Sequence, residues 1–523
     1  MKSDNRLLSL LSACLLCWIS SSAQTGISNG QFSASLESNS IIYMDDPVLG
    51  VHPKEDHFAS NDYLKMDYSS GNFSAGIQLE GYLPALYGFE IGDQTDYRKF
   101  FLASKYINWQ KDGLLVHIGD IYDQFGNGLI YRSFEDRNLG LNNSLEGIQA
   151  GYSLGRVLSL RAMMGHPRYY TEYLDTWVRG ADLQFSLSEL LHFDSLNLEF
   201  EAGYVNRYEE NYAFEAEPNV HLYSAALNFS FQGLNLKAEY AAKTRDIPAV
   251  LQNAHSGAAI LLEALYNRKN FSISADFRIL DHMGTMLSTT LSGTANSLNY
   301  LPSLSRQYHY MLANLNPHQV NVVGEAAGQL DLFYKLKSKE NRHRYWTLHL
   351  NASGASTISP SQADDGSIRL SWLDVNADLL CNWNKSFKTT FLFSRQEWNP
   401  SHGFQDISYV SNIFVMEASY KFAKKYALRG EIQYLNSQDY EKDWIAALLE
   451  FSIAPSLNVF VSDMYNSGSS KVHYYNAGIA LSKNRSRLQL SYGRNRAGYV
   501  CSGGVCRYSP AYTGLNFLLT TSF

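Results

Sequence analysis

Two cysteines near the end of the chain are spaced to form a covalent or metal-binding pair. Cys501 and Cys506 enclose residues 502–505, two of which are glycines that permit a tight reversal of the backbone. In an exported protein such a pair favours a disulfide over free thiols. Metal binding is disfavoured, because no histidine or third cysteine lies nearby in the sequence to complete a tetrahedral set. We therefore predict a Cys501–Cys506 disulfide at the closed tip of an outer hairpin.

The stretch from Gly119 to Gly140 mixes glycines with charged and aromatic residues. The glycines permit bends or a close approach of the backbone to other groups. One interpretation is an inward loop that lines a constriction or grips a partner, and the other is a loop packed on its own side chains and salt bridges. A phosphate-binding loop is excluded, since the further glycine, lysine and helix are missing. The side chains that could line a constriction are Asp120, Tyr122, Gln124, Arg132, Glu135, Asp136 and Arg137, and the last four could form a local ion network.

Enzyme motifs are not found in the sequence. The histidines are scattered, with no His-Glu-x-x-His pattern and no Gly-x-Ser-x-Gly elbow. A phospholipase on a barrel surface would need Ser, His and an orienting polar residue to converge, and no such set stands out. We predict a protein without enzymatic activity, cofactor or metal.

The first residues predict export. Lys2 and Arg6 precede an apolar run over residues 7–19, and small polar residues then lead to Ala23. This order is that of a secretory signal peptide, so we place the signal at residues 1–23 and the mature chain at residues 24–523. A lipoprotein box ending at Cys14 is the alternative, but it would leave about five apolar residues before the cut, against the usual 7–15.

The rest of the sequence favours a single all-β body. The chain has 36 Tyr and 27 Phe but only 12 Pro, which suits many regular strands. After residue 19 there is no run near the 18–20 apolar residues that a spanning helix needs. The formal charge of −7 is mild for this length and indicates no nucleic-acid partner.

Many segments alternate between an apolar and a polar face. Leu196–Tyr204 and Phe271–Ile279 each place aliphatic and aromatic residues on one side and Glu, Asp, Arg, Asn or Ser on the other. A soluble sandwich also alternates, but these segments run about 10–13 residues, which exceeds the usual length of soluble strands and suits a membrane crossing. Cys381 lies on the apolar face of such a segment, so we expect a lipid-facing thiol near the periplasmic rim with no chemistry.

Short and long connections also alternate, as in outer-membrane barrels with short periplasmic turns and longer outer loops. We predict one transmembrane antiparallel β-barrel of about 24 strands, an even number, that begins near Phe32. The sequence leaves no room for a plug domain before the barrel. The long loops at residues 122–146 and 284–323 are therefore the candidates to fold into the lumen.

The last strand, Thr513–Phe523, predicts how the barrel closes and assembles. Phe517, Leu519 and Phe523 share one face, and the chain ends on an aromatic residue. Such an ending resembles the signal that outer-membrane barrels present to their assembly machinery. We expect this strand to pair with the strand near Phe32, and we expect the barrel to contact outer-membrane lipid and, during biogenesis, that machinery.

The Gly119–Arg137 run, the Cys501–Arg507 segment and the terminal Phe523 together resemble an uncharacterised family of outer-membrane barrel proteins from Bacteroidota. The resemblance covers essentially the whole mature chain. It implies a barrel in the outer membrane of a Gram-negative cell, and it transfers no catalytic residue.

Two functions remain open from the sequence. The first is a porin-like channel or transport protein for small solutes, which the mixed-charge polar face and the lack of a plug would allow. The second is a structural or accessory barrel of a secretion or assembly complex, with a lipoprotein or another barrel as its partner.

Overall fold

A computed structural model describes residues 30–523, apart from 54–55, 90–97, 211, 213–216, 248–252, 342 and 359–366. The expected signal peptide lies outside the described residues.

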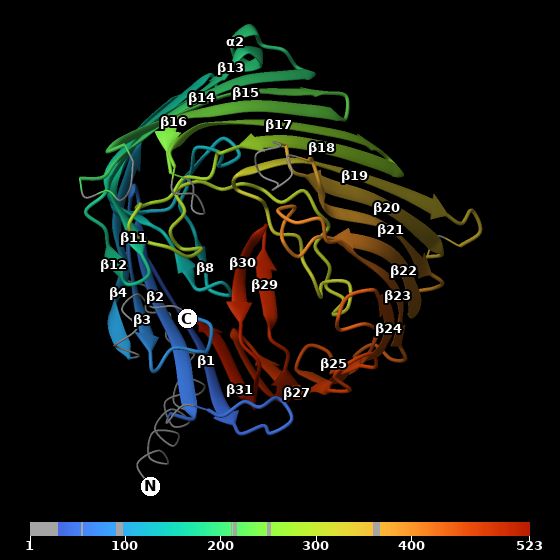
Figure 1. Cartoon of the computed structure of the whole chain (residues 1–523). Helices are drawn as coiled ribbons and strands as arrows, with labels where there is room; N and C mark the ends of the chain where they lie inside the picture. Colours follow the sequence, from blue (N-terminus) through green and yellow to red (C-terminus); the bar gives the residue numbers. More distant parts are fainter. Residues whose placement is uncertain are drawn as a thin grey trace.

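The chain forms a closed antiparallel barrel whose wall has 24 strands among the described residues (Figure 1). The predicted all-β barrel and strand number are therefore confirmed. The wall strands are β1 (Gln31–Met44), β2 (Phe58–Ser70), β3 (Phe73–Tyr82), β4 (Lys99–Lys111), β5 (Leu114–Ile121), β10 (Leu145–Leu154), β11 (Leu158–Tyr169), β13 (Trp177–Ser186), β14 (Leu196–Tyr208), β15 (Asn219–Phe231), β16 (Leu234–Asp246), β17 (His255–Arg268), β18 (Phe271–Asp281), β19 (Gly324–Lys337), β20 (Tyr345–Ser356), β21 (Leu370–Asn382), β22 (Phe387–Trp398), β23 (Tyr409–Lys421), β24 (Tyr426–Ser437), β25 (Trp444–Ile453), β26 (Leu457–Asn466), β27 (His473–Lys483), β28 (Ser486–Asn495) and β31 (Tyr512–Ser522).

The barrel closes where the first and last strands pair. β1 lies beside β31 in a register that runs from Ser35 opposite Ser522 to Met44 opposite Thr513. Beyond this ladder, the Phe523 amide donates to the Ala34 carbonyl at 2.8 Å. The terminal residue therefore adds to the seam, and the predicted pairing of the last strand with the strand near Phe32 is confirmed.

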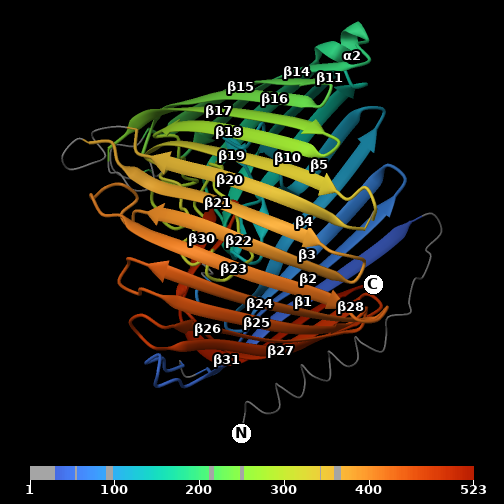
Figure 2. The ribbon, with the colours of Figure 1, turned by 90° about the vertical axis from the view of Figure 1, so that its right-hand side faces the viewer.

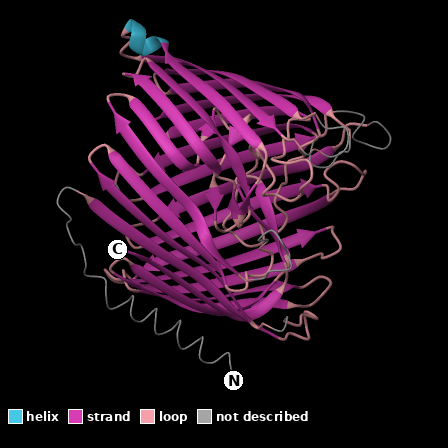
Figure 3. Ribbon diagram, turned by 90° about the vertical axis from the view of Figure 1, so that its left-hand side faces the viewer, coloured by secondary structure: helices cyan, strands magenta, loops and turns pink. Residues whose placement is uncertain are grey.

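The two ends of the barrel differ in their connections, and we call them the turn end and the loop end. At the turn end, pairs such as Asp112-Gly113 and Gln232-Gly233 reverse the chain with positive φ at both residues, the geometry of tight hairpin turns. The short helix α2 (Leu187–Leu191) also projects from the turn end, between β13 and β14 (Figures 2 and 3).

At the loop end, the connections carry short strands of their own. These are β6 (Gln124–Phe125), β7 (Tyr131–Arg132), β8 (Glu135–Asp136), β9 (Leu141–Asn142), β12 (Glu172–Tyr173), β29 (Gly498–Ser502) and β30 (Val505–Ser509).

The outer surface of the barrel is covered by large apolar side chains. Phe277, Phe414 and Ile432 are 43%, 50% and 64% exposed, and each lies on the face of its strand that points away from the lumen. Cys381 shares the outward face of β21 near the turn end and is a free thiol, but its side chain is only 4% exposed. The expected lipid-facing thiol is therefore covered by its neighbours.

Among the described residues of the loop end, three segments fold into the barrel (Figure 1). The first inward segment is residues 122–144, the second is residues 282–323, and the third, residues 496–511, carries the β29–β30 hairpin. The hairpin contains the predicted disulfide between Cys501 and Cys506. Its predicted place as an outer tip is wrong, because the hairpin packs inside the ring of strands against the other two segments.

Candidate binding cavity in the barrel lumen

The polarity of the inner face of the barrel changes along its strands. Toward the turn end, β15 presents Asn228 and Ser230 to the lumen, whereas toward the loop end the same face presents Val220 and Leu222, both fully buried. β14 and β18 also change from partly exposed polar residues to buried ones, with Val205 and Arg207 at the loop end of β14 and Arg278 and Leu280 at that of β18. We call these two parts of the lumen the turn half and the loop half. Apolar residues on the inner face need a cover, and the inward segments provide it.

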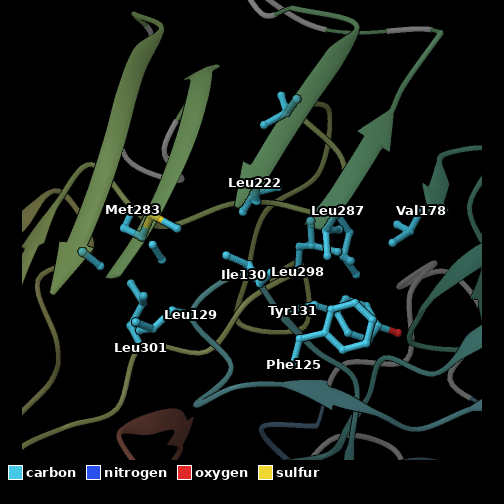
Figure 4. Close-up of a cluster of buried hydrophobic side chains, with 14 of the residues drawn as sticks. Phe125, Leu129, Ile130, Tyr131, Val178, Leu222, Met283, Leu287, Leu298 and Leu301 are labelled. Carbon is cyan, nitrogen blue, oxygen red and sulfur yellow. The ribbon is translucent and has the colours of Figure 1, made fainter. Parts of the chain in front are cut away.

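The first inward segment packs its apolar residues on this wall. Phe125, Leu129 and Ile130 are fully buried against the inner-face residues of β13–β18, together with Leu298 from the second inward segment (Figure 4). Burying large apolar side chains contributes roughly 1.5–3 kcal/mol each. The segment is therefore part of the core of the protein.

The tip of the first inward segment is fixed by charged residues at mid-depth. The Asn127 amide N–H donates to Glu239 at 2.8 Å, its side-chain amide donates to Glu263 at 3.0 Å, and Lys237 donates to its side-chain oxygen at 2.7 Å. At the adjacent Gly126 (φ 55°), a Cβ atom would lie 2.5 Å from the Glu239 carboxylate. A side chain at this position would therefore displace the Glu239 carboxylate that holds the tip.

Three of the residues predicted to line a constriction form hydrogen bonds that hold the first inward segment in place. Asp120 is buried and accepts hydrogen bonds from the Ser144 hydroxyl at 2.7 Å and the Tyr173 hydroxyl at 2.6 Å. Burial, with the adjacent Asp120 carboxylate, raises the pKa of the Tyr173 hydroxyl and keeps it a donor. The Tyr122 hydroxyl donates to Asn142 at 3.1 Å, and the Gln124 side chain donates to the Gly126 carbonyl at 2.9 Å.

The predicted ion network forms from two of its four members. Arg137 donates to Glu135 at 2.8 Å and to Glu37 on β1 at 2.9 Å. Although burial lowers the pKa of the Arg137 guanidinium, these two carboxylates outweigh it and raise the pKa above its usual value. This network fastens the segment to the wall at the β1 side.

The other two members have different contacts. The Arg132 guanidinium lies over the rings of Phe134 and Tyr300, at 4.4 and 4.1 Å from their centroids. Asp136 accepts hydrogen bonds from the backbone N–H groups of Asn138 and Leu139 at 3.0 and 3.2 Å. The structure brings Arg132 to the second inward segment and uses Asp136 to shape a turn.

The second inward segment is attached to the wall by fully buried charges. Arg207 of β14 donates to the Met286 carbonyl at 2.8 Å and to Asp246 of β16 at 3.0 Å. Lys243 of β16 donates to the Gly284 carbonyl at 2.7 Å and to the same carboxylate at 3.2 Å. Buried charges persist when they are paired and hydrogen-bonded, as these are.

A second buried site attaches the far end of this segment. Glu325 of β19 pairs with Arg278 of β18, and it also accepts from the Asn321 amide at 3.0 Å and contacts the His318 ring at 3.3 Å. Sequence reasoning missed these wall residues. Charged residues among apolar neighbours at the loop ends of the strands, such as Arg278 beside Ile279 and Leu280, were the available signal.

Between these ends, the second inward segment reaches another part of the wall, formed by β21–β25. The Tyr308 hydroxyl donates to Asp374 of β21 at 2.6 Å, and the Leu312 amide donates to Gln433 of β24 at 2.9 Å. Burial and the Asp374 carboxylate raise the pKa of Tyr308, which keeps its hydroxyl a donor. Tyr308, Leu312 and their neighbours form an apolar cluster with inner-face residues of β22–β25. The segment therefore lies in the lumen and connects two parts of the wall, β14–β16 and β21–β25.

The disulfide hairpin meets both other segments. The Tyr300 hydroxyl donates to the Gly503 carbonyl, and Arg507 donates to the Asn138 carbonyl at 3.3 Å. The Arg507 guanidinium lies 4.0 Å from the Phe89 ring centroid. These contacts place the hairpin between the first two segments.

A cavity of about 440 Å³ lies where the three segments meet. Its lining includes Phe134 and Leu141 of the first segment, Met286 and Leu301 of the second, and Val505 of the hairpin. No charged residue occurs in this lining among the described residues. Its volume is that of a small-molecule site. In the part of the chain that the structure describes, no cluster of His, Cys, Asp or Glu is arranged to hold a metal ion.

The comparisons with known proteins place the chain in a family. A family model described as "Family of unknown function (DUF6029)" matches residues 5–523. The chain belongs to this family. This agrees with the resemblance to an uncharacterised barrel family, whereas an origin in Bacteroidota stays a prediction. No curated protein matches the chain.

Several solved structures are similar to the chain at low identity. The siderophore receptor PirA from Pseudomonas aeruginosa is 8% identical, with 94% of this chain and 80% of that chain covered and a TM-score of 0.46. The P pilus usher (PapC) translocation pore is 9% identical, with 94% and 99% covered and a TM-score of 0.45. The copper transporter OprC is 9% identical, with 94% and 80% covered and a TM-score of 0.42. These likenesses concern the fold, and no functional argument rests on them.

Proposed function

We propose that this protein is an outer-membrane β-barrel that transports a specific small solute through a lumen narrowed by its own inward segments. The observation that carries the proposal is that the second inward segment lies in the lumen, is attached to two separate parts of the wall and borders a solute-sized cavity. A general diffusion pore needs an open lumen, whereas a selective transporter needs a site that contacts its solute.

The outer surface supports the membrane location. Aromatic and aliphatic side chains such as Phe277, Phe414 and Ile432 are exposed on the outward face of strand after strand. So large an apolar exterior is costly in water and suits a lipid environment. The short turns would then face the periplasm and the long loops the cell exterior.

Conductance in a planar bilayer tests the transport proposal. We expect small or rare currents from the wild type and a large, steady current after residues 286–320 are replaced by a short glycine-serine linker. The matched control replaces residues 467–471, in the β26–β27 loop, with the same linker, and its conductance should stay that of the wild type. Heat-dependent gel mobility shows whether each barrel is folded.

Two outcomes would contradict the proposal. A large steady current from the wild type would indicate a general diffusion pore. Silence of the folded variant that lacks residues 286–320 would indicate a barrel without a transport path.

The membrane location is tested by removing Phe523. Because the Phe523 backbone pairs with Ala34 at the seam, its deletion should lower the amount of protein in the outer-membrane fraction. Ser522→Ala, which retains the terminal aromatic residue, is the control. Equal amounts of the two variants would remove the role proposed for the terminus.

A second candidate function is that of a structural or accessory barrel, and α2 favours it. Leu190, Leu191 and Phe193 are 49%, 52% and 46% exposed at the projecting turn end. Apolar side chains gathered at a projecting site suit a protein partner. In-cell photo-cross-linking from position 190 should capture a defined partner, and Leu191→Ser should abolish that cross-link. A cross-link to lipid alone would count against this function.

A further inference from the structure

We infer that the cavity between the three inward segments binds an uncharged, largely apolar small molecule. The inference deepens the proposed transport function, on which it rests, by naming the chemical class of the solute.

The first argument is the position of the cavity. It lies in the lumen between segments that are fixed in place, so its walls are held apart without a ligand. The first segment is attached to the barrel wall through Asn127 and the second through Gly284 and Met286, whereas the hairpin is held to the second segment by the hydrogen bond from Tyr300 to Gly503. A preformed pocket binds without the cost of ordering its own loops.

The second argument is that three of the four amide side chains in the lining, those of Asn143, Asn296 and Asn299, already have partners. Asn143 donates to the carbonyls of Arg132 and Ser297 at 3.2 and 3.0 Å, and its oxygen accepts from the Phe134 amide at 2.7 Å. The side chains of Asn296 and Asn299 likewise donate to backbone carbonyls and accept from backbone N–H groups. These amides therefore shape the cavity, and they offer a solute few further hydrogen bonds.

The third argument is the placement of charge. Arg207, Lys243 and Arg278, which hold the second segment, are fully buried behind it and paired with carboxylates. Arg132 adjoins the lining, but its guanidinium lies against the rings of Phe134 and Tyr300. An ion that entered the cavity would lose its hydration without gaining a charged partner, which is costly.

Most of the lining surface that remains for a solute is apolar, although Gln319 and Thr294 also line the cavity. Phe134, Leu141, Met286, Leu301 and Val320 supply rings and alkyl groups from two segments, and Val505 supplies them from the hairpin. A solute that contacts such a lining removes apolar surface from water, which is favourable. An uncharged molecule with apolar groups satisfies all three arguments.

Two dyes that share a scaffold test this class. Phenylnaphthylamine is neutral, whereas anilinonaphthalenesulfonate carries a sulfonate, and the fluorescence of both rises in apolar sites. The full-length protein is held in lipid nanodiscs, and empty nanodiscs give the signal from lipid. We expect saturable binding of the neutral dye and binding of the sulfonate that is weaker by about tenfold or more, a difference of about 1.4 kcal/mol.

Two variants show whether the dye occupies this cavity. Val505→Trp fills it from the hairpin and Val320→Phe from the second segment, and each should remove most of the saturable binding. Val500→Trp changes the same hairpin at a residue that is 40% exposed and does not line the cavity, so its binding should stay that of the wild type.

The inference is overturned if the sulfonate binds as tightly as the neutral dye, or if both filling variants retain wild-type binding. Conductance separates this failure from that of the proposed function. Dye binding by a barrel without a transport path would leave a binding site but no transport, and transport without dye binding would overturn the solute class alone.

Discussion

The loop half and the turn half of the lumen are built from the same strands but are used differently. In the loop half, the inner face is apolar or carries paired charges, and three chain segments cover it. In the turn half, the same face carries residues such as Asn228 and Ser230 that are partly exposed. The residue type that suits a position in the wall therefore depends on how far along the strand the position lies, as well as on which face it occupies. The two halves should therefore respond differently to the same substitution.

The largest effect is expected from a buried charge of the loop half. Arg278→Ala leaves the Glu325 carboxylate buried without its ion-pair partner and should lower the free energy of unfolding by about 3–5 kcal/mol. The control is Arg156→Ala at the turn end, where the Arg156–Glu189 pair spans 3.9 Å and the arginine is 86% exposed. That change should cost less than about 1 kcal/mol. Urea unfolding of the refolded barrel measures both, and equal costs would remove the distinction between the halves.

Two inner-face positions of β15 compare the halves on one strand. Leu222→Ala opens a cavity under the inward segments and should cost about 2–5 kcal/mol, because Leu222 is fully buried in the main apolar cluster. Ser230→Ala lies on the same face of β15 in the turn half and should change the stability by less than about 0.5 kcal/mol. Similar costs for the two variants would show that the inward segments do not pack on the wall.

Removal of the disulfide shows how far the stability of the hairpin depends on this cross-link. The double substitution of Cys501 and Cys506 by Ser should lower the local stability of the hairpin by about 2 kcal/mol, since the closed loop is short. Faster trypsin cleavage after Arg507 is the expected readout, while the barrel stays folded. Cys381→Ser, which changes a free thiol of the wall, should leave that cleavage rate unchanged. Peptide mapping without reduction should find the two cysteines linked in the wild type.

The smallest effect is the expected difference in stability cost between two glycine substitutions at sites with the same backbone conformation. Gly126 in the loop half has φ 55°, and a Cβ atom there would meet the Glu239 carboxylate at 2.5 Å. Gly155 in a turn-end hairpin has φ 56° and open space around it. Alanine should cost about 1–2 kcal/mol at Gly155 from the backbone alone, and about 1 kcal/mol more at Gly126 from the lost contact of the tip. Unfolding in urea measures the difference, and equal costs would show that the tip moves aside freely.

The sequence predicted the barrel because its signals are local. Alternation over single strands, tight turns such as Asp112-Gly113 and the strand that ends at Phe523 each depend on neighbouring residues. At the loop ends the alternation weakens, since Leu222 lies beside Tyr223 and Leu280 beside Ile279 with apolar side chains on both faces. That weakening was the available signal for packing inside the barrel.

The candidate site was predicted only in part. The first inward segment and Cys501–Cys506 were recognised, but Asp120, Tyr122 and Gln124 hold the fold of that segment, and Arg132 and Asp136 contact groups outside the expected network. The residues that attach the second segment, such as Arg207 and Asp246, could not be paired from the sequence because they lie on different strands.

The sequence by itself determined the two faces of each strand and predicted a closed barrel of about 24 strands, because each residue of a strand faces outward or inward according to its place in a two-residue repeat. Only the tertiary structure decided where the loops lie. The hairpin of Cys501 and Cys506 folds inward because it contacts Tyr300 and Asn138, which are remote in the chain and meet only when the barrel closes. Burial of apolar surface between such remote segments has no local pattern, and this is the physical reason why the cavity became visible only in the folded molecule.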